Sequence, residues 1–225
     1  MSETLRVTIL DDHQSIVDGY VYRLEKEEGI EVAATVNFGE DLEPALAVHA
    51  TDVLLLDVNV PTSAGNRNPY PILHSIPQLL QTYPALNILV ISMHAERGLI
   101  RAVMDAGASG YILKDDQATV KNLGSVVKSI AAGGIHFSQI ALELYSKYLS
   151  TENNKLPTPR QLEVISLCAA YPDSTSSELA EKMKVSNSTV RNLLSATYLK
   201  LGIHNRAAAI ARARELGWIT PQHSG

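Results

Sequence analysis

Cysteine is almost absent from this chain: Cys168 is the single one among 225 residues. One cysteine excludes an internal disulfide and any metal site built from cysteine alone. The residues on either side of it, 164–167 and 169–170, are mostly apolar and are typical of a helix. We therefore expect Cys168 to be a buried thiol that fills space in a core.

Long hydrophobic runs are also missing. No apolar run approaches the roughly 20 residues that cross a bilayer. The first residues, MSETLRVTIL, lack the basic and then apolar order of a secretion signal. We therefore expect a cytoplasmic protein that makes no membrane contact.

Positive charge is scarce in the first two thirds of the chain and in excess in the last third. Residues 1–150 carry ten Lys and Arg against eighteen Asp and Glu, a balance of −8, while residues 151–225 carry nine against six, or +3. An acidic part followed by a basic part favours a regulatory unit joined to one that binds a polyanion.

Apolar and polar residues alternate between strand and helix patterns over roughly the first 135 positions. Two of the apolar runs, 54–56 and 88–91, are continuous, as in strands that are covered on both faces. Repeated strand–helix units predict a doubly wound α/β fold with a five-stranded parallel sheet. The expected strands cover residues 5–10, 31–36, 53–56, 87–91 and 110–113, and the expected helices cover 15–28, 41–50, 78–83, 97–105 and 117–132.

The last third of the chain is purely helical in pattern. A polar stretch at 150–155 follows an amphipathic helix at 139–149, and Thr158 can cap a helix that begins at Pro159. The short break at 184–187 between two further helices is typical of a helix-turn-helix. We expect one domain at 1–135, a linker with a helix at 136–155, and an all-α helix-turn-helix domain at 156–225.

Polar residues follow four of the apolar runs: Asp11-Asp12, Asp57, Ser92 and Lys114. In a parallel sheet these strand ends meet at one edge, where ligands bind. Carboxylates about 5 Å apart repel by roughly 3 kcal/mol per pair at an effective dielectric near 20, so a cation or protons must offset them. Oxygen ligands beside a phosphate favour Mg²⁺.

Asp57 is alone at the end of the central strand and is therefore the best candidate for a nucleophile that forms an acyl phosphate. Lys114 and Ser92 would then contact phosphoryl oxygens. The alternative is that the acids are turn or cap residues and that the lysine is solvated. Each residue alone permits that interpretation, and their convergence at strand ends argues against it.

These residues carry a resemblance to a known family. Residues 11–12, 54–57, 60–61, 91–92 and 106–114 together resemble the receiver domain of two-component response regulators, and residues 156–160, 177–180, 185–186, 189–191 and 200–206 resemble a LuxR-type helix-turn-helix. This order is that of the NarL/FixJ family.

The resemblance implies a flavodoxin-like receiver, Mg²⁺ as cofactor, a histidine kinase as phosphodonor, double-stranded DNA as partner and a homodimer when phosphorylated. It implies that Asp57 is the phosphoacceptor. The other implied site residues are Asp11, Asp12 and the backbone carbonyl of Asn59 for the metal, and Ser92, Tyr111 and Lys114 for the switch and the phosphoryl group.

The chain departs from the family pattern after Asp57. Residues 66–71 are rich in Asn and Pro and lengthen the segment before the third helix. Since Pro77 would break that helix, we expect it to begin near Ser75, with Gln78 completing a capping box. His94 and the pair Asp115-Asp116 are interpreted as solvated loop residues.

The second helix of the helix-turn-helix is expected to lie in the major groove of DNA, with its first residues near base edges. Arg191 is the main candidate base contact, and Asn192 suits adenine. Leu193, where the family often has histidine, cannot donate a hydrogen bond. The full expected DNA-binding set is Thr189, Arg191, Asn192, Lys182, Lys184, Lys200 and Arg206, the alternative being a solvated face.

We expect a transcription regulator rather than an enzyme. One alternative is a regulator of the same architecture that is gated by a ligand or partner without phosphate. The other is a phosphatase that turns over through an aspartyl phosphate, although no second general acid is evident beside Asp57.

Overall fold

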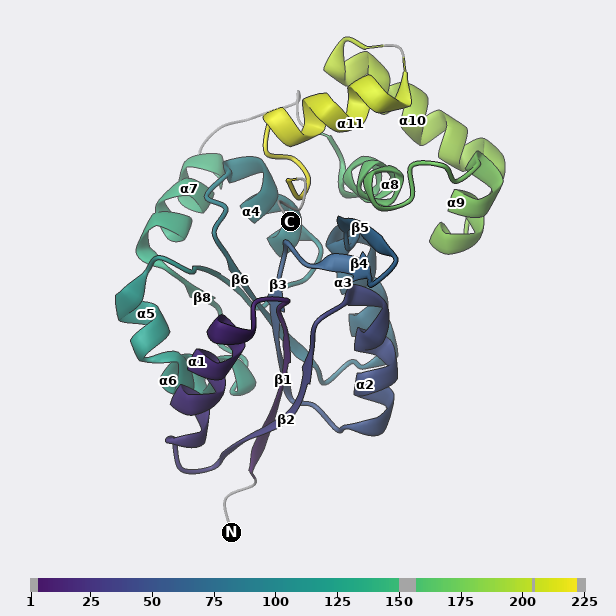
Figure 1. Ribbon diagram of the computed structural model, residues 1–225. Helices are drawn as coiled ribbons and strands as arrows, with labels where there is room; N and C mark the ends of the chain where they lie inside the picture. Colours follow the sequence, from purple (N-terminus) through teal and green to yellow (C-terminus); the bar gives the residue numbers. More distant parts are fainter. Residues whose placement is uncertain (1–3, 150–156, 204, 222–225) are drawn as a thin grey trace.

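A parallel sheet lies at the centre of the computed structural model, which describes residues 4–149, 157–203 and 205–221 (Figure 1). The strands lie in the order β2-β1-β3-β6-β7-β8, and every neighbouring pair is parallel. Their bounds are Leu5–Leu10 (β1), Ile30–Val36 (β2), Val53–Asp57 (β3), Asn87–Ser92 (β6), Gly110–Leu113 (β7) and His136–Phe137 (β8).

The sixth strand, β8, is a difference from the five strands that the sequence predicts. His136 pairs with Gly110, and Phe137 pairs with Tyr111. The carbonyl oxygen of His136 approaches Gly110 so closely that a Cβ at that glycine would collide with it. Glycine on β7 therefore permits this backbone pairing, and a strand of two residues is too short to show a periodic pattern.

Helices cover both faces of the sheet, which confirms the doubly wound α/β class. α1 (Gln14–Glu25) and α6 (Leu123–Ala131) bury apolar side chains against one face. α2 (Leu42–Val48), α3 (Ile72–Thr82) and α4 (Arg97–Asp105) cover the other face. None of the helices in the described part of the chain combines the length and apolar character that a bilayer crossing requires.

Two predicted helices differ most clearly from the structure. α3 begins at Ile72 instead of Ser75 and includes Pro77, and no side chain caps its first turn. The buried apolar side chains of Ile72, Ile76 and Leu79 favour the longer helix even though Pro77 removes one backbone hydrogen bond.

The helix predicted at 117–132 is likewise divided into two. α5 (Gln117–Lys121) is separated from α6 by Asn122, whose φ of −101° and ψ of 24° are not helical. Preceding them, Asp116 accepts hydrogen bonds from Thr119 N at 3.1 Å and Thr119 Oγ1 at 2.9 Å. Asp116 is therefore the cap of α5, which corrects its interpretation as a solvated loop residue.

The Asn- and Pro-rich segment after β3 forms a β-hairpin that the sequence analysis did not predict. β4 (Pro61–Ser63) pairs antiparallel with β5 (Asn66–Pro69). Thr62 Oγ1 donates to the Asn68 carbonyl at 2.8 Å across the hairpin. In Figure 1 the hairpin lies next to the helices of the C-terminal part.

Among the described residues, four helices make up the C-terminal part, and a further helix precedes it. The preceding helix is α7 (Gln139–Leu149), and the others are α8 (Pro159–Ala170), α9 (Ser176–Met183), α10 (Asn187–Leu201) and α11 (Arg206–Glu215). The predicted start of α8 is confirmed, because Thr158 Oγ1 accepts from Gln161 N while Gln161 Oε1 accepts from Thr158 N. α9 and α10 form the predicted helix-turn-helix.

Cys168 on α8 is fully buried, as predicted, and burial raises the pKa of its thiol to about 11. Because the thiolate is the reactive form, we expect the folded protein to react with DTNB at pH 8 about 100-fold more slowly than the unfolded chain. The release of thionitrobenzoate with and without guanidinium measures this difference. Equal rates would show that the thiol is accessible in the folded state.

Candidate functional site: the acidic edge and the DNA-facing helix

Strand ends bring the predicted acids to one edge of the sheet. Asp11 follows β1 and Asp57 ends β3, and both side chains are buried, with 2% and 4% of their surface exposed. The Asp11 carboxylate accepts a hydrogen bond from His13 N at 2.9 Å, and the Asp57 carboxylate accepts one from Asn59 N at 3.2 Å. The backbone therefore orients both carboxylates.

Lys114, which follows β7, lies between these two acids. Its Nζ donates to Asp11 Oδ2 at 2.6 Å and to Asp57 Oδ2 at 2.8 Å. Burial raises the pKa of the Asp57 carboxyl, and the Lys114 ammonium opposes part of that rise. Burial alone would lower the pKa of Lys114, but the charges of Asp57 and Asp11 outweigh it and the pKa is raised. The lysine is therefore a permanent cation at this edge.

A divalent cation fits the same edge. Donor atoms of Asp11, Asp12, His13 and Asp57 all lie within 4.8 Å of one another. Three of the four groups are carboxylates, the hard oxygen donors that Mg²⁺ prefers. His13 was not among the predicted ligands; its Nδ1 lies 2.9 Å from Asp12 Oδ1, and half of its side chain is exposed.

Ser92 and Tyr111 lie on neighbouring strands beside this cluster. Both residues are fully buried, and burial raises the pKa of the Tyr111 phenol above its ordinary value. The Tyr111 hydroxyl donates to the carbonyl oxygen of His94 at 2.7 Å, while Ser92 Oγ accepts from His94 N at 3.0 Å. His94 thus joins the two residues through its backbone, a contact that the sequence analysis missed.

The predicted DNA-reading residues lie on α10. Thr189, Arg191 and Lys200 are exposed, and Arg191 Nε donates to Asn187 Oδ1 at 3.3 Å. Asn192 belongs to the same helix. Leu193 is half-buried and packs against the apolar core, so its side chain is turned inward.

Three other predicted phosphate contacts have neighbours within the protein. Lys182 Nζ lies 4.0 Å from the centre of the Tyr171 ring. Lys184 is the residue at the C-terminal cap of α9 and has a φ of 53°. Arg206 donates to the carbonyl oxygens of Pro172 and Ser174, and so it fastens the loop between α8 and α9.

The two parts of the chain are held together by a set of polar contacts centred on α3 and α8. His74 Nδ1 lies 2.8 Å from Glu163 Oε1, and each side chain is only 9% exposed. The second oxygen of Glu163 accepts from Arg160 at 2.8 Å. At the hairpin, Asn66 Nδ2 donates to the Ala170 carbonyl at 3.1 Å.

Nothing in the sequence pairs these groups, because the partners are separated by about ninety residues or more. The one available signal was the unusual length of the segment after Asp57, which proves to be the hairpin that contacts α8. Side chains that pair across the contact between two parts of the chain produce no repeating pattern of apolar and polar residues in the local sequence.

Comparison with known families covers both parts of the chain. Residues 7–123 match the response regulator receiver domain, and residues 156–213 match the bacterial regulatory proteins of the luxR family.

Curated relatives match over most of the length of the chain. The transcriptional regulatory protein DegU of Brevibacillus brevis is 27% identical, with 96% of this chain and 95% of DegU covered. DesR of Bacillus subtilis, also a transcriptional regulatory protein, is 28% identical over 95% of this chain and 98% of its own. The response regulator UvrY of Escherichia coli is 26% identical, with 89% of each chain covered.

Solved structures show the same fold. RcsB from Salmonella enterica serovar Typhimurium, bound to promoter rprA with a phosphomimetic, is 23% identical, with a TM-score of 0.66 and coverage of 93% of this chain and 98% of that one. A second RcsB structure from Salmonella typhimurium has a TM-score of 0.64 at 22% identity, with 95% and 98% covered.

Proposed function

The chain belongs to the response regulators, as a receiver domain followed by a luxR-type domain, and we propose that phosphorylation of Asp57 switches its binding to DNA. The observation that carries the proposal is the position of Asp57, whose buried carboxylate lies against Lys114 at the edge where Asp11 and Asp12 gather. In this proposal the receiver comprises residues 1–135, the linker residues 136–155 and the DNA-binding domain residues 156–225.

Mg²⁺ would be held by Asp11, Asp12, Asp57 and the backbone carbonyl of Asn59. When bound, it neutralises carboxylate charge and stabilises the negative charge on a transferring phosphoryl group. The Asp57 carboxylate is the attacking nucleophile, and a phosphohistidine of a histidine kinase is the donor. Lys114, already an ammonium 2.8 Å from Asp57, donates hydrogen bonds to the new phosphoryl oxygens.

Ser92 connects the phosphoryl group to the rest of the molecule. When the Ser92 side chain rotates away from His94 to donate to a phosphoryl oxygen, the hydrogen bond that its Oγ accepts from His94 N is broken. The loop that carries His94 also carries Glu96, which packs against Gly217 of the C-terminal domain. Gly98 is packed closely against Trp218 of the same domain, since a Cβ at this glycine would lie 2.7 Å from the Trp218 side chain. The Tyr111 ring is already fully buried, so further burial of this ring cannot be the change that reports phosphorylation. We therefore infer that the signal passes through the loop that carries His94 and Glu96.

The test of the proposed function is the set of DNA sites that the protein occupies in cells. Chromatin immunoprecipitation of the wild-type protein should recover specific sites under conditions that support phosphorylation. The Asp57→Asn variant, expressed to the same level, should lose most of them. Equal occupancy by both proteins would favour a regulator that a ligand or partner gates without phosphate.

Arg191 and Lys200 should differ in what they contribute to DNA binding. Arg191→Ala should cost about 1–3 kcal/mol on a specific site and relax the preference at one position per half-site, as expected for a bidentate contact to guanine. Lys200→Ala should weaken specific and random DNA alike and reduce the salt slope by about one. Fluorescence anisotropy at several salt concentrations measures both effects. A uniform loss for Arg191→Ala would make it a backbone anchor.

Phosphorylation should also shift a monomer–dimer balance, since palindromic half-sites call for a twofold protein. The new group adds roughly −1.5 to −2 charges and three strong acceptors at the receiver edge. Sedimentation velocity with and without beryllofluoride should show a larger dimer fraction when the phosphoryl mimic is present. Identical distributions over a wide concentration range would contradict switching by dimerisation.

A further inference from the structure

A cavity of about 630 Å³ lies between the receiver and the DNA-binding domain. Its receiver wall includes one face of α3 and the start of α2, and its other wall comes from α8 and α9. This volume falls within the range of roughly 300–1,000 Å³ that is usual for small-molecule sites. The cavity lies away from the acidic edge and includes none of the residues assigned to phosphorylation.

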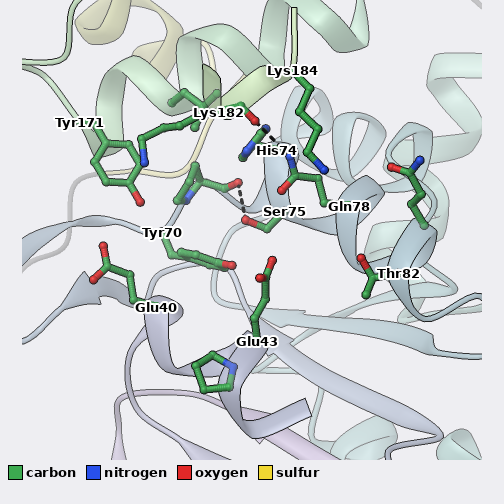
Figure 2. Close-up of a pocket in the computed structure, with 15 residues that line it drawn as sticks. Glu40, Glu43, Tyr70, His74, Ser75, Gln78, Thr82, Tyr171, Lys182 and Lys184 are labelled. Atoms are coloured by element: carbon green, nitrogen blue, oxygen red, sulfur yellow. Dashed lines mark hydrogen bonds between the residues drawn. The ribbon is translucent and has the colours of Figure 1, made fainter. Parts of the chain in front are cut away.

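Charges of opposite sign lie on opposite walls of this cavity. Glu40 and Glu43 belong to the receiver wall, and Lys182 and Lys184 belong to the wall from the DNA-binding domain (Figure 2). All four residues are exposed to the cavity and to solvent. Within the described residues, neither glutamate forms an ion pair with either lysine. A molecule in the cavity would therefore meet two anionic groups at one end and two cationic groups at the other.

Aromatic and hydrogen-bonding groups lie between these charged ends. Tyr70 and Tyr171 present their rings to the cavity, and Ser75 and Gln78 line its α3 side (Figure 2). Lys182 is held over the Tyr171 ring, and its carbonyl accepts a hydrogen bond from Gln78 Nε2 at 3.2 Å. The N–H and C=O groups of a peptide-like ligand can form hydrogen bonds with the polar side chains that lie between the two charged walls.

We propose that this cavity binds small zwitterionic molecules of peptide-like chemistry, with ammonium groups at Glu40 and Glu43 and acid groups at Lys182 and Lys184. A ligand in this orientation contacts both domains at once. It stabilises the arrangement in which they are docked, because it binds that arrangement and not the separated one. Lys182 and Lys184 are also predicted phosphate contacts, so a bound ligand would compete with DNA; this second effect rests on the proposed function.

Two dipeptides of identical composition test the charge separation. Lysyl-glutamate has both ammonium groups at one end and both carboxylates at the other, whereas glutamyl-lysine has one of each at both ends. Isothermal titration calorimetry on the full chain should show at least tenfold tighter binding of lysyl-glutamate. The preference should disappear in Glu43→Gln and in Lys184→Met, and should persist in Glu28→Gln and Lys121→Met, which change exposed charges outside the cavity.

Equal binding of the two dipeptides, absence of binding, or an unchanged preference in Glu43→Gln and Lys184→Met overturns the site. Anisotropy of labelled DNA in saturating lysyl-glutamate tests the second effect, with at least a threefold loss of affinity expected. If the calorimetry succeeds and the DNA affinity stays constant, the coupling to DNA is overturned and the ligand site stands. A failure of DNA binding without any dipeptide would instead count against the proposed function.

Discussion

The Asp57→Asn variant is expected to take up no phosphoryl group. In wild-type protein, incubation with acetyl phosphate and Mg²⁺ should add the mass of one phosphoryl group, because the Asp57 carboxylate attacks phosphorus while Lys114 and the cation neutralise charge. Asparagine keeps the size of the side chain but removes the nucleophilic oxygen. Intact-protein mass spectrometry after quenching at low pH gives the result directly.

Asp115→Asn is the matched control, because Asp115 is an exposed acid next to Lys114 at the same edge of the sheet. This variant should be modified at the wild-type rate. Removing Mg²⁺ with EDTA should abolish the reaction of both proteins that retain Asp57. Full modification of Asp57→Asn at another residue would disprove the assignment of the phosphoacceptor.

The His74→Ala variant is expected to bind DNA more tightly than wild-type protein when neither is phosphorylated. In the docked arrangement, Lys182 and Lys184 line the cavity beside the receiver. His74 stabilises this arrangement through its 2.8 Å contact with the buried Glu163. Loss of a buried partner costs roughly 1–3 kcal/mol. Because docking holds these lysines away from DNA, the affinity of the variant for DNA should rise by about 5-fold to 150-fold.

Anisotropy with a DNA site recovered from cells measures this effect, and His49→Ala, a change at an exposed histidine of the receiver, is the control. The control should leave the affinity unchanged. Circular dichroism should show that both variants remain folded. A weaker or equal affinity for His74→Ala would mean that the docked arrangement does not limit DNA binding.

The parallel sheet and its acidic edge were predictable because both depend on local patterns. Continuous apolar runs such as those ending at Asp57 and Ser92 specify strands that are covered on both faces, and parallel topology brings their ends together. Lys114 was expected at this edge as a contact for a phosphoryl group, and its bridge between Asp11 and Asp57 was not predicted. Helix starts with a strong local signal, such as Thr158-Pro159, were also correct.

Elements that depend on distant packing were not predictable. α3 begins at Ile72 and includes Pro77 because its apolar side chains are buried between the sheet and α8. Intrinsic helix propensities do not include the free energy that is gained from this burial. The β4–β5 hairpin has no alternating apolar pattern. The position of Lys182 beside the receiver depends on how the two domains dock, and that information lies in neither segment alone.

The apolar core described for the α2, α3 and α4 face of the sheet does not stop at the domain boundary. One continuous cluster includes Leu73 and Ile76 on α3 together with Leu162 and Ile165 on α8. If another output domain without matching apolar side chains on its first helix were joined to this receiver, the α3 surface would be left open to water. The α3 surface of this receiver is therefore matched to the first helix of its own DNA-binding domain.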